Sequence, residues 1–433
     1  MITSLVAFSA LTTSAPDLSG WKLLDDCSHR AFNYFVERSD AATGFTKDRS
    51  ANFTPEDNPE HVVASVATVG FALSAYAVGD HRGWMTHKEA IAKSRNTIRH
   101  MIDLAPKSHG WYYHWLNWKT GKIEWNSEVS TIDSSIFFCG LILNERALKD
   151  PEISKMTSKI LKGIDWDYML HNGGNKPEKN MFTMGYQNGH FLDSDWGEYS
   201  ENAMIYLLAI GLDPSLPADL WRAFERKKYE AYGKTVLSGG PLFMHQMSHI
   251  FFDFKGKRDG LGIDYWANSR LMTLLQRRYA TENPKGYKGY SKDIWGFSAC
   301  DIPDGYGAQG FPGGYLGDNF DNGTLAAPAA LASMMFTPKE SMAAADAFYR
   351  EYRDAYGRYG FSSGINPTKN WHSADMIGID QGQMMLGIEN ARDGWPNKTF
   401  MSHPAVKLAM KRAGFRETKE GPLENRPVIV SMK

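Results

Sequence analysis

The chain has 433 residues with a net charge of −1, and 42% of them are hydrophobic, which is typical of a globular protein with a large apolar core. The near-neutral charge and the absence of a long basic run argue against nucleic acid or an anionic membrane as the main partner. Three widely spaced cysteines, Cys27, Cys139 and Cys300, show no metal-ligand spacing. We therefore expect buried thiols rather than a disulfide framework.

The N-terminal segment is apolar and rich in small residues. Residues 1–16 resemble the apolar core and cleavage region of a secretory signal without its basic start, and a flexible tail or a misassigned start codon would look the same. We expect residues 1–20 to be a signal or flexible segment, residues 21–433 to form one domain, and the protein to be periplasmic or secreted. No other segment approaches the roughly 18 uninterrupted apolar residues of a membrane span.

Helical apolar periodicity dominates the remaining chain. It predicts helices over residues 23–37, 62–78, 88–104, 131–148, 153–170, 199–210, 218–232, 242–254, 264–279, 325–335, 338–356, 381–391 and 403–412. Long loops rich in glycine, aromatic and acidic residues alternate with short connections. Antiparallel helix hairpins arranged in a ring would give this rhythm, so we expect a single all-α toroid. The alternative, a run of independent bundles, lacks a dividing linker.

Four of these predicted helices begin beside acidic residues. In chain order the acids are Glu128 and Asp133, then Glu198 and Glu201, then Asp264, and finally Asp380. Each start alone is most simply an N-cap. Four starts at one rim of a ring would instead line a common acidic pit, where repulsion and burial keep at least one carboxyl protonated near neutral pH. Glycoside hydrolysis needs one protonated and one ionised carboxyl.

Aromatic side chains accompany two of the acidic segments. Trp196 and Tyr199 lie among the four acids of residues 193–201, although an ordinary capped helix with a wet loop would look similar. Residues 294–307 combine aromatic and acidic residues with turn chemistry, and Trp295 and Tyr306 are candidates for stacking on a sugar. The chain has no phosphate-loop signature.

A histidine pair has the spacing of a zinc site. His245 and His249 are four residues apart, and Asp253 follows at the same spacing. The glutamate that follows the first histidine in metalloproteases is missing. We therefore expect buried or sugar-binding histidines, and no metal.

Seven motifs together carry a resemblance to a known family. They lie at residues 44–49, 130–133, 196–201, 240–249, 288–296, 299–306 and 378–382. On them the chain resembles the bacterial glycoamylase-like family, which includes the endo-β-1,2-glucanases of glycoside hydrolase family 144. The resemblance implies an (α/α)6 barrel that hydrolyses β-1,2-glucan with inversion, either endo-acting or exo-acting with release of sophorose.

The resemblance also implies a set of site residues. It assigns Glu198 as general acid and Asp380 as general base, with Asp133, Glu128 and Glu201 as further catalytic candidates. The expected substrate-binding residues are Trp125, Trp196, Tyr199, His245, His249, Asp253, Tyr265, Trp295, Asp301, Asp304, Tyr306 and Gln381. We expect no cofactor, a β-linked glucan as the binding partner, and a monomer.

Other functions remain open from the sequence. A β-1,2-glucan transglycosylase or a noncatalytic glycan-binding protein would use the same scaffold. A polysaccharide lyase of the same toroid class is a further alternative, but it needs cations to neutralise a uronate. Few basic residues lie near the motifs; they are Lys255, Lys257 and Arg258.

Overall fold

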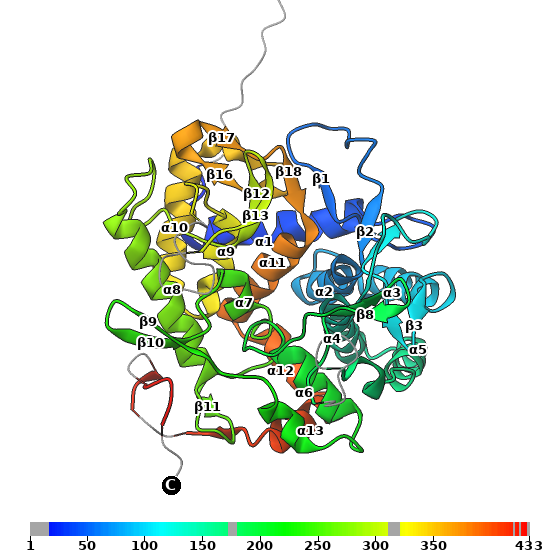
Figure 1. Cartoon of the computed structure of the whole chain (residues 1–433). Coiled ribbons are helices and arrows are strands. Elements are labelled where there is room, and N and C mark those ends of the chain that lie inside the picture. Colours follow the sequence, from blue (N-terminus) through cyan, green and yellow to red (C-terminus); the bar gives the residue numbers. More distant parts are fainter. Residues whose placement is uncertain (1–16, 172–179, 311–320, 419–420, 424–425, 431–433) are drawn as a thin grey trace, which may run out of the picture.

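The computed structural model describes residues 17–171, 180–310, 321–418, 421–423 and 426–430 (Figure 1). Its helices are α1 (Gly20–Glu37), α2 (Val66–Arg82), α3 (His87–Asp103), α4 (Thr131–Leu148), α5 (Pro151–Lys162), α6 (Ala203–Leu212), α7 (Leu242–Gln246), α8 (Tyr265–Glu282), α9 (Ala327–Ala332), α10 (Pro338–Glu351), α11 (Gly378–Arg392), α12 (Trp395–Met401) and α13 (Pro404–Arg412). Most of the predicted N-terminal segment, residues 1–16, lies outside the described residues.

Short strands connect the helices. They are β1 (Arg49–Ala51), β2 (Val63–Ser65), β3 (Lys107–Ser108), β4 (Trp111–Tyr112), β5 (Trp115–Asn117), β6 (Val129–Ser130), β7 (Gly185–Gln187), β8 (His190–Phe191), β9 (Lys228–Ala231), β10 (Lys234–Leu237), β11 (Lys257–Arg258), β12 (Ala299–Ile302), β13 (Gly305–Ala308), β14 (Tyr356–Gly357), β15 (Gly360–Phe361), β16 (Ile365–Asn366), β17 (Trp371–His372), β18 (Asp375–Ile377) and β19 (Arg416–Glu417). Each pairs antiparallel with a neighbour.

The helices form two layers, which confirms the predicted (α/α)6 barrel. Nearly every residue of α2 and α4 is buried, because both are apolar all round, whereas α3 and α5 bury a single face. The inner helices α2 and α4 pack closely at two glycines. A Cβ on Gly140 would lie 2.0 Å from the carbonyl oxygen of Gly70, so no larger residue fits at this crossing.

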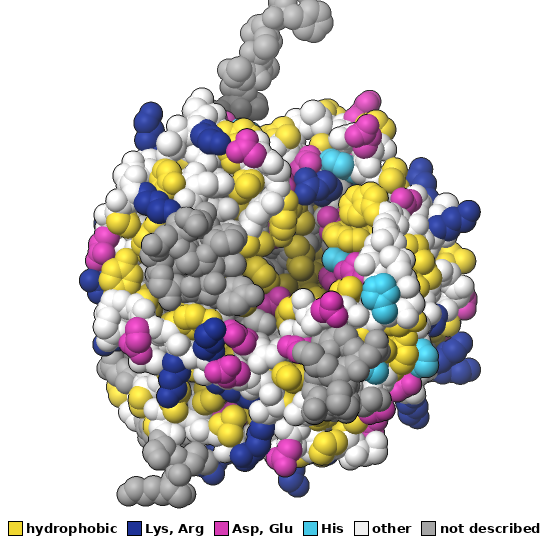
Figure 2. Space-filling view, viewed as in Figure 1, with side chains coloured by type: hydrophobic (Ala, Val, Ile, Leu, Met, Phe, Trp, Pro, Cys, Tyr) yellow, Lys and Arg dark blue, Asp and Glu magenta, His cyan; other side chains and the backbone are white. Residues whose placement is uncertain are grey.

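Three inner helices follow directly from a short strand. The strands β2, β6 and β18 run into α2, α4 and α11, and they pair with β5, β7 and β1 of the adjoining loops. These small sheets therefore fix the N-termini of the inner helices at one rim. Figure 2 shows that this face of the molecule is hollowed at its centre, with acidic and histidine side chains at the walls of the hollow.

Several predicted helices are shorter than their periodicity indicated. The predicted helix over residues 218–232 is wrong beyond the 3-10 turn Ala218–Arg222, because β9 and β10 form a hairpin around Gly233, whose φ is +68°. The helix predicted over residues 242–254 continues only as far as Gln246. Helix α6 begins at Ala203, so Glu198 and Glu201 lie in the loop before it. Strands of two to four residues carry too little periodicity to be recognised in the sequence.

The three cysteines are buried and unpaired, as predicted. In the part of the chain that the structure describes, no helix has the length and apolar character that a bilayer crossing requires.

Candidate active site

The hollow at the rim gathers carboxyl groups from loops that are distant in the sequence. Asp48 precedes β1, Asp133 lies in the first turn of α4, Glu201 precedes α6, and Asp380 lies in the first turn of α11. Their charges act on one another, since Asp133 raises the pKa of Glu201 and Asp48 raises the pKa of Asp380. The predicted acidic pit is therefore present at this end of the barrel.

One wall of the cleft holds an imidazole between two carboxylates. The Nδ1 atom of His114 lies 2.8 Å from Glu128 Oε1, and its Nε2 atom lies 3.3 Å from Asp133 Oδ1. Burial disfavours the charged ring, but Asp133, Glu128 and Asp48 outweigh burial and raise the pKa of His114. Burial likewise raises the pKa of Glu128, but the hydrogen bond and charge of His114 outweigh it and lower that pKa. At neutral pH this wall therefore presents the ionised carboxylate of Glu128.

These three side chains lie within 4.8 Å of one another, which is also close enough to share a divalent ion. The two ring nitrogens of His114 face different carboxylates, however, as a doubly protonated imidazole requires. The Ser130 hydroxyl also donates to Asp133 Oδ2 at 2.6 Å. His114 and the Ser130 hydroxyl therefore already act as partners of these two carboxyl groups.

Glu201 faces a cavity of about 560 Å³ beside this wall. Its Oε2 atom is buried and has no hydrogen-bond partner among the described residues. Burial is the main cause that raises the pKa of Glu201 to about 7, and the charge of Asp133 adds to it, while Ser200 opposes the shift. Glu201 thus changes its protonation state in the physiological range.

Asp380 faces the cleft from the first turn of α11. Burial is the main cause that raises its pKa to about 8, and Asp301 and Asp48 contribute to the rise. The Ser363 hydroxyl donates to Asp380 Oδ2 at 2.9 Å and partly offsets the shift. The cleft therefore contains a second carboxyl that titrates near neutral pH.

Glu198, the predicted general acid, lies at the mouth of the same cavity as Glu201. Its side chain is 37% exposed, and its carboxylate lies 3.3 Å from both Lys227 Nζ and the Tyr229 hydroxyl of the β9–β10 region. Glu198 and Glu201 are therefore in different environments, although three residues separate them. Glu198 is paired and solvated, whereas Glu201 is enclosed and unpaired.

Exposed aromatic side chains flank the cleft. Trp125 is 68% exposed and has a φ of +53°, a strained conformation for a tryptophan. Its ring meets Trp115 edge-on at 5.1 Å, and Trp115 stacks on His114 at 3.7 Å. Tyr306 is 56% exposed, and its pKa is raised by burial of its hydroxyl and by the charges of Asp380, Asp48 and Asp301. Trp125 and Tyr306 therefore keep an exposed ring, and their role in binding a sugar stays a prediction.

Other predicted sugar platforms are enclosed in the core. The indole of Trp196 is buried and donates from Nε1 to Thr131 Oγ1 at 2.8 Å. Tyr199 is buried and packs on Tyr265 at 5.0 Å, and Trp295 is fully buried. Because stacking needs an open ring face, these residues support the walls of the cleft rather than offering a surface to a sugar.

The histidine pair and its neighbours do not lie with the acids. His245 is fully buried, and burial lowers its pKa to about 3. His249 bonds the Ser269 hydroxyl through Nε2 at 3.0 Å, and Asp253 pairs with Lys257 at 2.7 Å. The structure therefore places neither His249 nor Asp253 in the cleft.

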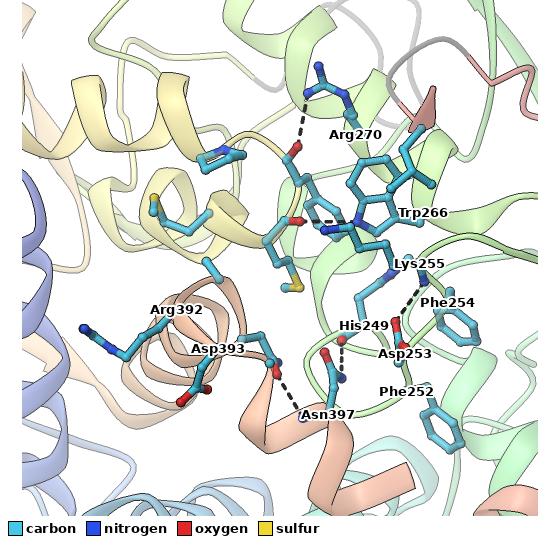
Figure 3. Close-up of a pocket in the computed structure, with 18 of the residues that line it drawn as sticks. His249, Phe252, Asp253, Phe254, Lys255, Trp266, Arg270, Arg392, Asp393 and Asn397 are labelled. Carbon is cyan, nitrogen blue, oxygen red and sulfur yellow. Dashed lines mark hydrogen bonds between the residues drawn. The ribbon is translucent and has the colours of Figure 1, made fainter. Parts of the chain in front are cut away.

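His249 and Asp253 instead line a second cavity of about 630 Å³ between the C-terminal end of α11 and the first turns of α8 and α10 (Figure 3). Asp264 caps α8 at this end, accepting from Ala267 N, so the expectation that all four acidic helix starts share one rim is wrong for α8. The physical reason is the direction of the helix: the N-terminus of α8 lies at the end of the barrel where the C-terminus of α11 lies, away from Asp380.

Three predicted residues have local structural partners. Asp301 accepts hydrogen bonds from Arg49 at 3.1 Å and from Ser373 at 2.6 Å at the edge of the cleft. Asp304 is exposed and pairs with Lys369 at 3.3 Å. Gln381, next to Asp380, is fully buried and its Nε2 atom faces Met376 Sδ.

Four cleft residues were missed in the sequence as site residues: Asp48, Arg49, His114 and Trp115. Asp48 and Arg49 end one of the recognised motifs, which was a usable signal. His114 and Trp115 lie in the aromatic stretch at the start of β5. The residue spacing of this stretch does not show which of its side chains line the cleft and which are in the core.

Comparison with known proteins agrees with this architecture. The family model described as "Glycoamylase: Putative glucoamylase" matches residues 193–404. The exo-β-1,2-glucooligosaccharide sophorohydrolase (non-reducing end) of Parabacteroides distasonis is 28% identical over 90% of this chain. The chain spans only 57% of that relative's length.

Two solved structures show the same fold. The endo-β-1,2-glucanase of Chitinophaga pinensis, in complex with sophorotriose and glucose, matches with a TM-score of 0.82 at 26% identity, over 92% of this chain and 99% of its own. The endo-β-1,2-glucanase of Talaromyces funiculosus, in complex with sophorose, is 12% identical and matches with a TM-score of 0.66 over 96% of this chain and 95% of its own, which is a likeness of fold alone. The predicted resemblance to the glycoamylase-like family is therefore confirmed, by the family model over residues 193–404 and by the fold over nearly the whole chain.

Proposed function

We propose that this chain is a glycoside hydrolase that cleaves β-1,2-linked glucose chains, with Glu201 and Asp380 as its proton-transferring carboxyls. The observation that carries the proposal is the protonation pattern of the cleft. Burial raises the pKa values of Glu201 and Asp380 to about 7 and about 8, in a cleft where His114 keeps Glu128 ionised and where His61 and Arg49 keep Asp375 ionised. General acid and base catalysis works best when the pKa values lie near the operating pH.

The reaction needs one carboxyl protonated and the other ionised. Protonated Glu201 donates to the glycosidic oxygen as the bond from that oxygen to the anomeric carbon breaks. Ionised Asp380 takes a proton from water, whose oxygen attacks the anomeric carbon from the opposite face, so the product has inverted configuration. The Ser363 hydroxyl favours the accepting form of Asp380. The predicted general base is thus retained, and Glu201 replaces Glu198 as acid in our proposal.

The nature of the cleft supports a neutral sugar substrate. The cations placed there, Arg49, His114 and Lys227, already pair with carboxylates, which leaves them poorly placed to neutralise the carboxylate of a uronate. This disfavours a polysaccharide lyase. Exposed rings at Trp125 and Tyr306 offer apolar faces of the kind on which a glucose ring stacks. The linkage is inferred from the relatives, which are named as enzymes acting on β-1,2-glucan. Export and the monomeric state stay predictions.

The test is hydrolysis of linear β-1,2-glucan by the purified chain. We expect new reducing ends, with products identified by chromatography and their anomeric form by polarimetry. The variants E201Q and D380N should each lower kcat by about a thousandfold, since each removes a proton-transfer group. E198Q should lose less than tenfold, and E230Q, on the exposed β9 strand, should be unchanged.

Two outcomes would change the proposal. No reducing sugar from β-1,2-glucan would contradict the hydrolase, and longer chains formed without net hydrolysis would indicate a transglycosylase. An E198Q variant as impaired as D380N, with E201Q still active, would return the acid role to Glu198. Wild-type activity in both E201Q and D380N would contradict the proposed pair.

A further inference from the structure

Arg49 lies at the point where the N-terminal part of the chain meets the helix that carries Asp380. It begins β1 and faces Ile377 of β18 in the antiparallel register, and β18 leads directly into α11. The carbonyl oxygen of Asp48 accepts a hydrogen bond from Gly378 N, the first residue of α11, at 2.6 Å. The segment around Arg49 is therefore attached to the helical turn that presents Asp380.

The guanidinium of Arg49 bridges two carboxylates. Its Nη2 atom lies 3.1 Å from Asp301 Oδ1, and its Nη1 atom lies 3.2 Å from Asp375 Oδ2. Asp301 is held from a second direction by the Ser373 hydroxyl at 2.6 Å. The forked shape of the guanidinium suits this bridge, whereas a lysine ammonium is a single point of charge.

The bridge is the inner part of a chain of alternating charges. Asp375 also lies 3.4 Å from His61 Nε2, and the Nδ1 atom of His61 lies 3.0 Å from Asp57. Although burial opposes it, the pairing with both carboxylates raises the pKa of His61 to about 9. Asp57 in turn pairs with Lys47 at 2.5 Å. Asp375 is thus held ionised from both sides.

We propose that Arg49 is a positioning residue, which holds Asp301 in place beside Asp380 and anchors Asp375 on the strand that leads to it, and thereby sets the pH at which Asp380 exchanges its proton. The inference rests on the proposed function, in which Asp380 accepts a proton from water. The side chain of Arg49 is 33% exposed, so its charge reaches the cleft while its two ion pairs fix its orientation.

The groups that face Asp380 come from several elements. The Ser363 hydroxyl donates to it, and Asp301 of β12, Asp48 and Arg49 act on its pKa through their charges. Asp380 in turn raises the pKa of the buried Cys300 thiol and of Tyr306 on β13. Of these groups Arg49 is the cation. Its removal leaves Asp380 facing uncompensated negative charge, which favours the protonated carboxyl.

The experiment compares three arginine variants. R49M removes the charge, R49K keeps the charge without the fork, and R82K is the matched control. Arg82 also bridges two carboxylates, Asp25 at 2.9 Å and Glu389 at 2.8 Å, but it ends α2 at the opposite end of the barrel. We expect R49M to move the acidic limb of the kcat/KM profile upwards by about one pH unit, because Asp380 must be ionised to accept a proton, with R49K between it and the wild type. R82K should leave both limbs in place.

A second measurement is independent of sugar release. Because burial raises the native pKa of Asp380 from 3.8 to about 8, ionisation of this group destabilises the native state. The difference in Tm between D380N and the wild type should therefore increase as the pH rises to about 8. In the R49M background this gain should continue to a higher pH. An unchanged pH profile in R49M, or equal shifts in R49M and R82K, would overturn the inference. If the wild type releases no sugar, the proposed function fails, and the Tm series alone decides the role of Arg49.

Discussion

The two ends of the barrel contain similar residues in different electrostatic states, and helix α11 connects them. At its N-terminal end burial raises the pKa of Asp380 to about 8, and in the loop before α6 burial raises the pKa of Glu201 to about 7. At its C-terminal end, Glu389 accepts from the Ser28 hydroxyl at 2.6 Å and from Arg82 at 2.8 Å. Among the described residues neither Glu201 nor Asp380 has an ion-pair partner, whereas Glu389 pairs with Arg82.

The cavities at the two ends of the barrel have similar volumes, so volume does not show which of them binds a substrate. The cavity beside Trp266 is slightly larger than the one beside Glu201, at about 630 against about 560 Å³. Figure 3 shows how its polar groups bind the protein itself: Arg270 donates to the Phe336 carbonyl at 3.1 Å, and the Asn397 side chain donates to the His249 carbonyl at 3.0 Å. Unsatisfied carboxyls, rather than volume, mark the functional end.

The largest test of this comparison replaces one glutamate at each end. E389Q breaks a buried ion pair and should lower the free energy of unfolding by about 3 kcal/mol at all pH values where the pair is ionised. E201Q should instead raise the free energy of unfolding at neutral and alkaline pH. Because the native pKa of Glu201 is raised to about 7 from 4.5, the native state loses stability as the pH rises from 4.5 to 7.

The E201Q variant should therefore match the wild type near pH 4 and exceed it by up to about 3 kcal/mol at pH 8. Urea unfolding at the two pH values measures both effects. Equal destabilisation by E201Q and E389Q at pH 8 would show that Glu201 is as well compensated as Glu389, which would remove the contrast between the ends.

A smaller effect is expected at the rim of the cleft. Trp125 is exposed and makes few contacts besides Trp115, so W125A should retain the Tm of the wild type. If its ring stacks on a sugar, KM should rise about fivefold with little change in kcat. Trp21 is also exposed, but it lies over Arg392 at the opposite end of the barrel, so W21A is the control. An unchanged KM in W125A would exclude Trp125 from the substrate path.

The smallest effect on catalysis is expected at His249. H249Q can keep the hydrogen bond to Ser269, and it should lower stability by about 1–2 kcal/mol through imperfect packing of the buried side chain. Its kcat/KM should remain within twofold of the wild type. Michaelis–Menten kinetics on β-1,2-gluco-oligosaccharides give this value, and a KM raised tenfold would place His249 in a sugar subsite after all.

The sequence predicted the cleft acids better than the aromatic residues of the cleft. Asp133, Asp380 and Glu201 were found because an acid at the start of an apolar helix is a local pattern. Trp196 and Tyr199 share a motif with Glu201, and Trp295 lies in a separate recognised motif, yet all three are buried. An aromatic residue in a loop has the same local sequence pattern whether its ring is buried or exposed. Only the tertiary packing decides whether the ring supports the cleft from inside or offers a face to a sugar.

The sequence by itself determined the layered helical fold, the buried cysteines and the family resemblance, because each depends on periodicity, composition or ordered motifs. The tertiary structure decided which acids share a cleft and which of them keep a proton. It brought Asp48 and Arg49 beside Asp380, more than 300 positions away, and it placed Asp264 at the opposite end of the barrel. Proton affinity depends on burial and on the charges nearby, and both are fixed only when distant segments meet.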